Sequence, residues 1–324
     1  MFTLPALLTF FNAAVADDGE PKWADLTKVE IVSSADGTEQ PSLVWVPENV
    51  GEQPRPLLIC LHTWSGDYTQ DNSPWLKEAV GRGWLFIHPH FRGMNNTPAA
   101  CGSKLARQDI LDALAWMQDH YPVDNGRIYL AGASGGGHMT MLMAGHHPDR
   151  FSAASAWVGI SDIAEWYRFH VKDGKPDDYA QHILDALGGP PGASKEIDAD
   201  YRDRSPIFHL AGAVEIPLDI AAGVMDGHTG SVPIQHSLLA YNVLAKKQKL
   251  PTLPEDEIEE LWVNHKLSHP TGSDRGIDES YGREIVLRRT AGKTRITLFD
   301  GGHEGLPHAA CEWLAKQKRE TKSK

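Results

Sequence analysis

The residues best suited to chemistry lie at positions 132–136, which read GASGG and match the pattern G-x-S-x-G. The apolar run 128–131 before them predicts a strand, and apolar residues at helical spacing up to Pro148 predict a helix after them. A serine on such a sharp turn has a strained backbone, which glycine neighbours relieve. Its hydroxyl would stand above a helix N-terminus, whose free N–H groups can bind an oxyanion. The pattern favours Ser134 as a nucleophile over a plain glycine-rich turn.

A nucleophilic serine needs a base to accept its proton and an acid to orient that base. Asp226 follows the predicted strand 217–224, and His303 follows the predicted strand 294–300. Both stand in glycine-rich loops, so their side chains can approach closely. Because the carboxyl ends of parallel strands meet at one edge of a sheet, we expect them to converge on Ser134.

The oxyanion of such a reaction needs two N–H donors. One would be Gly135, directly after the serine. The second should come from the loop after the predicted strand 56–61, which reads His62-Thr63-Trp64. The backbone N–H of Trp64 is the first choice and that of Thr63 the second.

Other acids and histidines have simpler explanations. Asp300 and Asp162 also follow predicted strands, where capping is the expected role. His228 and His308 do not stand at strand ends. Two histidine pairs could suggest a metal but have no acidic or cysteine partner at ligand spacing: His88 with His90, and His146 with His147. The sequence therefore predicts no metal site and no cofactor.

Composition limits the class of protein. The 324 residues carry a net charge of −12, which argues against nucleic acid and anionic membranes as partners. Three cysteines are too few for a disulfide scaffold, and Cys101 with Cys311 is the one pairing to consider. Residues 1–16 form an apolar run that ends in Ala-Val-Ala, as a signal peptide does, and are too short to span a bilayer comfortably. We therefore expect export.

Predicted strands alternate with predicted helices along most of the chain. The strands fall at 28–47 (a hairpin), 56–61, 83–88, 128–131, 153–158, 217–224, 284–290 and 294–300; the helices lie near 75–80, 106–121, 139–147, 233–246 and 309–316. This alternation predicts an α/β protein with a mostly parallel sheet covered on both faces. Residues 17–324 would form one domain. Within it, 161–213 form either a cap over the site or a surface insertion, and 247–283 form a polar excursion.

These motifs resemble the α/β-hydrolase superfamily and, within it, the catalytic domain of the prolyl oligopeptidase family and its esterase relatives. The matching pieces are 89–93 (PHFRG), 109–113 (DILDA), 127–137 (RIYLAGASGGG), 148–151 (PDRF), Asp226 before Val232-Pro233, and Gly302-His303. The resemblance covers about residues 30–318. It implies that Ser134, Asp226 and His303 are nucleophile, acid and base, which also stand in the chain order of that superfamily.

The chain departs from the family pattern in a few places. Thr63 stands where the family usually has glycine after the histidine of the oxyanion loop. Residues 227–231 resemble a small insertion between the acid and the Val-Pro pair, and the interval from Asp226 to His303 is long. The propeller domain of the oligopeptidases is not expected, since the first central strand begins near residue 56.

The residues and the resemblance together predict an exported serine hydrolase that works through an acyl-enzyme. The first choice is a carboxylesterase acting on short-acyl esters, including esters of carbohydrates. One alternative is a serine peptidase acting on small peptides, and another is a catalytically silent binding protein of the same fold. Four tryptophans either line a cleft that stacks on sugar rings or pack in the core: Trp64, Trp75, Trp157 and Trp166.

Overall fold

The computed structural model describes residues 22–48 and 50–320. Within them, nine strands form one sheet in the order β1-β2-β4-β3-β5-β6-β9-β11-β10. The strands are β1 (Thr27–Val32), β2 (Glu39–Trp45), β3 (Arg55–Leu61), β4 (Leu85–Pro89), β5 (Val123–Ala133), β6 (Ala153–Trp157), β9 (Leu218–Gly223), β10 (Ile285–Ala291) and β11 (Thr294–Phe299). Strands β4, β3, β5, β6, β9 and β11 pair in parallel, while β2 joins β4 and β10 joins β11 in antiparallel pairs. The predicted mostly parallel sheet is confirmed.

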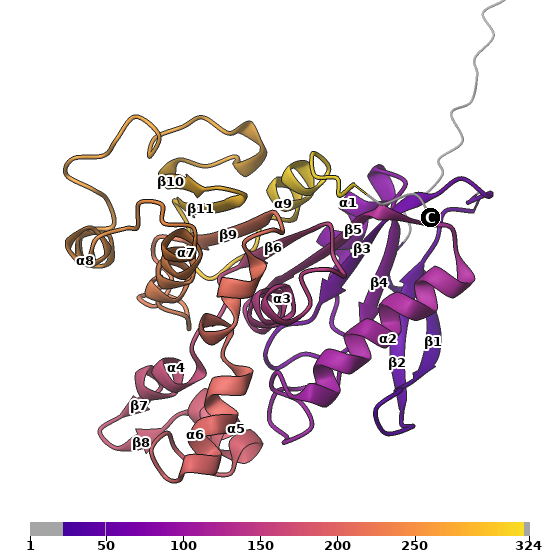
Figure 1. The fold of residues 1–324 in the computed structure, drawn as a ribbon, viewed down its shortest axis with the longest axis horizontal. Helices are drawn as coiled ribbons and strands as arrows, with labels where there is room; N and C mark the ends of the chain where they lie inside the picture. The colour runs from indigo at the N-terminus through magenta and orange to yellow at the C-terminus, as the bar shows by residue number, and fades with distance from the viewer. Residues whose placement is uncertain (1–21, 49, 321–324) are drawn as a thin grey trace, which may run out of the picture.

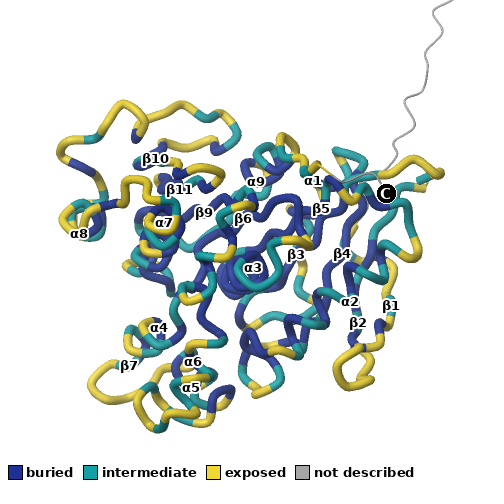
Figure 2. Tube along the Cα trace, viewed as in Figure 1, coloured by how far each residue is buried: buried dark blue, intermediate teal, exposed yellow. Residues whose placement is uncertain are grey.

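The central strands are buried on both faces. Every residue of β4, β6 and β9 is buried, which explains why these segments are mostly apolar in the sequence. Strand β2 alternates buried and more exposed positions, as a strand covered on one face does. Figure 2 shows the buried colour along the middle of the sheet and along the helix that follows β5.

Helices cover both faces of the sheet (Figure 1). They are α1 (Ser73–Gly81) and α9 (Pro307–Leu314), which pack together on one face, and α2 (Lys104–His120), α3 (Gly135–His146) and α7 (Gln235–Lys247), which lie on the other. Helix α3 is buried along nearly its whole length, because it packs against β3, β5 and β6 at the centre of the sheet. The ends of the predicted helices differ from these by one or two residues, except that α3 begins four residues earlier than predicted.

Residues 161–213, which we call the cap segment, form a small helical unit beside the sheet (Figure 1). It contains α4 (Ile163–Phe169), the hairpin β7 (Val171–Lys172) and β8 (Lys175–Pro176), α5 (Asp178–Leu187), α6 (Lys195–Arg204), η2 (Pro206–Phe208) and η3 (Leu210–Ala213). Its apolar side chains form a cluster of their own, which reaches Trp64 in the loop after β3. The hairpin was not predicted, because its two-residue strands are too short to show alternation.

The segment 247–283 contains α8 (Glu255–Asn264) and η4 (Glu279–Tyr281), and a further short turn, η1 (Trp23–Asp25), precedes β1. The sequence analysis did not predict α8. Only Ile258 and Leu261 of this helix are buried, so its apolar pattern is too sparse to predict a helix. Figure 2 shows that most of the surrounding loop is exposed.

A buried ion pair ties the turn after β4 to α2. Arg92, whose φ is +77°, donates from Nε to Asp109 Oδ2 at 2.5 Å and from Nη2 to Asp109 Oδ1 at 3.0 Å. Its Nη1 donates to Asp36 in the β1–β2 turn at 2.7 Å. The hydrogen bonding of Asp36 to Arg92 holds the pKa of Asp36 well below its usual range. Two motifs of the family resemblance, 89–93 and 109–113, are therefore in direct contact.

All three cysteines are buried and unpaired, so the considered bridge between Cys101 and Cys311 is not formed. Cys101 belongs to the cluster of the cap segment, whereas Cys311 packs in the main core. The expected signal peptide, residues 1–16, lies outside the described residues. Among the residues that are described, no helix combines the length and the apolar character needed to cross a bilayer.

Replacing Asp109 should destabilise the fold. Asp109→Ala would leave the buried Arg92 guanidinium without its main partner, which should lower the free energy of unfolding by about 3 kcal/mol. Asp112→Ala is the matched control, because Asp112 stands one helical turn further along α2 and binds the more exposed Ser34. It should cost less than about 1 kcal/mol. Urea unfolding followed by circular dichroism measures both, and equal losses would contradict this account.

Candidate active site

Ser134 stands at the end of β5, directly before α3. Its backbone is in the left-handed half of conformational space, with φ 57° and ψ −118°. Its N–H donates to the carbonyl oxygen of Trp157 in β6 at 2.9 Å, and its own carbonyl accepts from the N–H of His138 at 2.8 Å. A non-glycine residue with such torsions is strained, and strain of this kind clusters at functional positions. The predicted sharp turn from strand to helix is present.

Asp226 and His303 are in direct contact. Both carboxylate oxygens of Asp226 lie 2.9 Å from Nδ1 of His303. The Asp226 side chain is fully buried, and its Oδ1 also accepts from the N–H groups of Gly227 at 3.0 Å and Val232 at 3.2 Å. A buried carboxylate needs such donors. The arrangement fixes the imidazole ring and directs Nε2 away from the acid.

The loop after the acid packs tightly over this pair. A Cβ atom on Gly230 would lie 2.3 Å from Asp226 Oδ1 and 2.4 Å from His303 Cβ. Only a residue without a side chain fits at this position. The segment 227–231, which the sequence presented as a small insertion, therefore covers the contact between acid and histidine.

The loop after β3, residues 62–64, is called the oxyanion loop here. It offers one free N–H in addition to that of Gly135. A Cβ atom on Gly135 would lie 2.3 Å from the backbone nitrogen of Trp64, so the oxyanion loop packs directly against Gly135. Within the described residues, neither the N–H of Gly135 nor that of Trp64 has an acceptor. The N–H of Thr63 instead donates to Gln70 Oε1 at 2.8 Å. The carbonyl of Trp64 accepts twice from Asn95, at 3.0 and 3.1 Å, which fixes the orientation of the loop.

The side chain of His62 binds the first residue of the oxyanion loop to the turn after β4. In the tautomer protonated at Nε2, it donates to the carbonyl oxygen of His90 at 2.8 Å, and its ring stacks on Phe91 with centroids 3.8 Å apart. Burial lowers the pKa of His62 to about 4, so the ring is neutral near pH 7. It acts as a structural hydrogen-bond donor and not as a second base.

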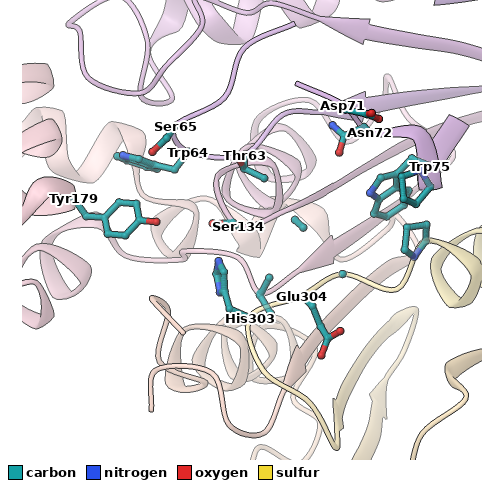
Figure 3. Close-up of a pocket in the computed structure, with 15 residues that line it drawn as sticks. Thr63, Trp64, Ser65, Asp71, Asn72, Trp75, Ser134, Tyr179, His303 and Glu304 are labelled. Carbon is teal, nitrogen blue, oxygen red and sulfur yellow. The ribbon is translucent and has the colours of Figure 1, made fainter. Parts of the chain in front are cut away.

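Ser134 and His303 line one pocket of about 390 Å³. Figure 3 shows them between its two ends, with the His303 ring directed toward Ser134. One end holds Trp64, Ser65 and Tyr179; the other holds Asp71, Asn72 and Trp75. Among the described residues, no hydrogen bond joins Ser134 to His303. Hydrogen bonds between catalytic groups are often long in ligand-free structures and tighten when substrate binds.

Two residues of this site were not predicted from the sequence. Tyr179 of α5 directs its hydroxyl into the pocket (Figure 3), and no motif in the cap segment indicated it. Ser231 Oγ lies 3.4 Å from His303 Nε2. The unusual spacing of segment 227–231 was the available signal for Ser231.

The cap segment holds the loop that carries Ser231. The carbonyl oxygen of Ser231 accepts from Trp166 Nε1 at 2.7 Å and lies 2.8 Å from His170 Nε2. His170 Nδ1 is in turn 2.6 Å from Asp177 at the start of α5. The cap segment therefore helps to position the loop above the acid and the histidine, besides contributing a wall of the pocket.

The remaining predicted residues lie elsewhere. Trp157 and Trp166 are fully buried, so neither ring offers a face to a substrate, and the core alternative applies to both. Trp64 and Trp75 line the pocket but are almost fully buried, with 1% and 5% of their surface exposed. Asp162 caps α4, as expected.

Asp300 lines a separate surface hollow together with residues of the 265–286 segment. His228 stacks on Trp262 with ring centroids 3.8 Å apart, and His308 contacts Glu78 at 3.2 Å. None of these side chains lines the pocket of Ser134. Asp226 and His303 are therefore placed to act with Ser134, whereas Asp300, His228 and His308 are not.

Charge at the pocket is mainly negative. The carboxylates that line it are those of Asp71 and Glu304, and no lysine or arginine is among its lining residues. Glu304 is paired with Arg283 at 2.8 Å on an exposed surface, where such a pair contributes little. The pocket is therefore poorly suited to a substrate whose reacting end is anionic.

Residues 79–260 match the sequence pattern of the prolyl oligopeptidase family. The chain belongs to this family. The family assignment predicted from the sequence is confirmed, and the matched range includes Ser134 and Asp226 but ends before His303.

Proteins similar to this chain carry both peptidase and esterase names. The uncharacterized peptidase YtmA of Bacillus subtilis is 28% identical over 173 residues, which are 52% of this chain and 62% of that protein. Feruloyl esterase B of Talaromyces stipitatus is 27% identical over 146 residues, 42% of this chain and 40% of that one. The chain thus matches less than two thirds of the length of either relative.

Solved structures show the fold. An acylaminoacyl peptidase bound to a chloromethyl ketone superimposes with a TM-score of 0.62 and 18% identity, over 93% of this chain and 43% of that one. The predicted α/β-hydrolase fold is confirmed by this likeness.

Filling the space at Gly230 should disable the serine without unfolding the protein. Gly230→Ala would push Asp226 and His303 apart, and a displacement of about 1 Å at reacting groups costs about 10²-fold in rate. The measurement is the rate at which a fluorophosphonate probe labels Ser134. Gly272→Ala is the control, because nothing lies within 4 Å of a Cβ atom there. Unchanged labelling in Gly230→Ala would contradict the proposed dependence on this contact.

Proposed function

We propose that this chain is an exported serine hydrolase, and specifically a carboxylesterase that cleaves short-acyl esters through an acyl-enzyme. Ser134 is the nucleophile, His303 the general base and Asp226 the residue that orients His303. The backbone N–H groups of Trp64 and Gly135 hold the oxyanion. The observation that carries the proposal is the strained Ser134 in one pocket with a histidine whose other nitrogen is bound to a buried carboxylate.

Each step of the reaction has a group to perform it. His303 Nε2 takes the Oγ proton as Ser134 attacks the carbonyl carbon, and the oxyanion forms beside the two free N–H groups. When the tetrahedral intermediate collapses, His303 returns the proton to the departing alkoxide. Water then attacks the acyl-enzyme by the same route, releasing the acid and restoring the Ser134 hydroxyl.

The size of the pocket and its end groups support a short acyl chain. A volume of about 390 Å³ is at the small end for ligand pockets. Asp71, Asn72 and Trp75 lie together at one end, and Asn72 Nδ2 is buried there without a hydrogen-bond partner among the described residues. The polar groups of Asp71 and Asn72 suit the hydroxyls of a sugar. An acylated carbohydrate is therefore included among the proposed substrates.

The chemistry of the leaving group favours ester over peptide. An alkoxide leaves readily once the oxyanion is stabilised, whereas an amide nitrogen must be protonated while the peptide is held in register. The negative charge at the pocket also disfavours a peptide whose free carboxylate would lie near Asp71. Feruloyl esterase B among the relatives is consistent with an ester substrate. Export rests on the apolar residues 1–16.

Ser134→Ala tests the nucleophile. It should lower turnover of 4-nitrophenyl acetate by about 10⁶-fold and abolish labelling by a fluorophosphonate, because no other group can form the acyl-enzyme. Ser65→Ala is the matched control, since Ser65 is a serine of the same pocket, and it should keep labelling intact. Labelling that survives Ser134→Ala and disappears in Ser65→Ala would relocate the site. A wild-type protein that neither labels nor turns over any ester would favour the silent binding alternative.

Esters should be better substrates than amides of the same acyl group. We expect kcat/KM for 4-nitrophenyl acetate and butyrate to exceed that for any prolyl 4-nitroanilide by at least about 10²-fold, a transition-state difference of about 2.7 kcal/mol. The ester and the amide of one acetylated proline give a matched pair in which only the leaving group differs. A prolyl amide cleaved as efficiently as its ester, with short-acyl esters no better, would establish the peptidase alternative instead.

A further inference from the structure

Three side chains with metal-binding donors meet at the far end of α3. They are His146, the last residue of α3; Asp203, in the last turn of α6; and His209, between η2 and η3. One nitrogen of each histidine and one carboxylate oxygen lie within 4.8 Å of one another. The two rings are 3.9 Å apart between centroids, tilted by 33°. In the sequence, His146 stands next to His147 alone, and the other two donors are distant in the chain.

Both histidines have a nitrogen free to bind. Nε2 of His146 is buried without a hydrogen-bond partner among the described residues. Nε2 of His209 donates to the carbonyl oxygen of Arg202 at 3.0 Å, in a tautomer that leaves Nδ1 unprotonated. A metal-bound histidine almost always donates its other N–H in this way.

Asp203 is oriented by a neighbouring cation. Arg107 donates from Nη2 to Asp203 Oδ2 at 3.0 Å and from Nη1 to the Asp203 carbonyl oxygen at 3.1 Å. Oδ1 has no hydrogen-bond partner within the described residues. The guanidinium fixes the carboxylate as an outer-shell partner does, but its positive charge opposes a metal ion. We therefore expect a moderate affinity, not that of a site built from several carboxylates or thiolates.

We propose that His146, Asp203 and His209 bind one divalent metal ion, with Zn²⁺ the preferred occupant. Two imidazoles and one carboxylate are ligands that zinc accepts, with water to complete the coordination. Calcium and magnesium prefer oxygen ligands alone, so the pair of imidazoles disfavours both. Small side-chain shifts would bring the three donors to bonding distance.

The position of this site indicates a structural role. Ser134 precedes α3 and His146 ends it, so the 12 residues of the helix separate the two by about 18 Å. The cap segment packs directly on this end, because a Cβ atom on Gly145 would lie 2.9 Å from the backbone of His209. A metal ion here would fasten the cap segment to the helix of the nucleophile. The inference does not depend on the proposed esterase activity.

The first measurement is metal binding to the full chain without a histidine tag, after removal of bound metal with a chelator. Calorimetric titration with Zn²⁺ should give one ion per chain with a Kd of roughly 10 µM or tighter, and Co²⁺ should show ligand-field absorption in the visible. Saturating Zn²⁺ should raise the Tm by about 5 °C, because an ion that binds only the folded state stabilises it.

Variants separate this site from surface binding. His146→Ala and His209→Ala should each weaken Zn²⁺ binding by at least about 10²-fold, whereas His147→Ala, the adjacent histidine outside the cluster, should bind like the wild type. Asp203→Asn keeps the shape of the side chain and serves if an alanine variant fails to fold. A wild-type protein that binds no stoichiometric Zn²⁺ would overturn the proposal. So would binding that persists in both histidine variants, since the ion would then be adventitious.

Discussion

The left-handed backbone of Ser134 is the constraint on which the site depends. Holding a non-glycine residue at φ 57° and ψ −118° costs about 1–3 kcal/mol, and the surrounding structure must offset it. The N–H of Ser134 is bound by Trp157 of β6, and a Cβ atom on Gly136 would lie 2.4 Å from the carbonyl oxygen of Leu61 in β3. Three neighbouring strands thus hold the serine in place. The hydroxyl is positioned by the sheet as a whole and not by its own loop.

The cap segment is the second support of the same site. Its residues Trp166 and His170 converge on the carbonyl oxygen of Ser231, and Ser231 in turn lies against His303. The segment 227–231 is therefore fixed in two ways. Its ends are bound to the Asp226 carboxylate, and its residue Ser231 is bound by the cap segment. A cap attached in this way cannot move far without disturbing the histidine. This coupling makes the attachment of the cap segment to α3, at His146 and His209, relevant to the geometry of the whole site.

The sequence was most informative where periodicity and strand ends coincide. The alternation of buried strands and helices predicts the sheet, and three strand ends deliver Ser134, Asp226 and His303 to one edge. It was least informative where contacts join distant segments without a repeating pattern. Tyr179 lies on a short cap helix, and its hydroxyl reaches the pocket only through the packing of α5. The sequence favoured the core for Trp157 and Trp166 but left the sugar cleft open, because the side chain of tryptophan suits both places.

The departure of Thr63 from the family pattern has a physical explanation in the oxyanion loop. A threonine after His62 brings a side chain and an N–H that both need partners in a crowded loop. Gln70 supplies them, since its Oε1 lies 2.8 Å from the Thr63 nitrogen and 3.1 Å from Oγ1. With the Thr63 N–H engaged, the next peptide along the chain is the one free to serve an oxyanion. The carbonyl oxygen of that peptide belongs to Thr63 and accepts from the N–H of Gly66 at 3.2 Å, and the nitrogen of Trp64 lies against Gly135. The substitution is therefore compatible with a free donor at the site, because Gln70 satisfies both the side chain and the N–H of Thr63.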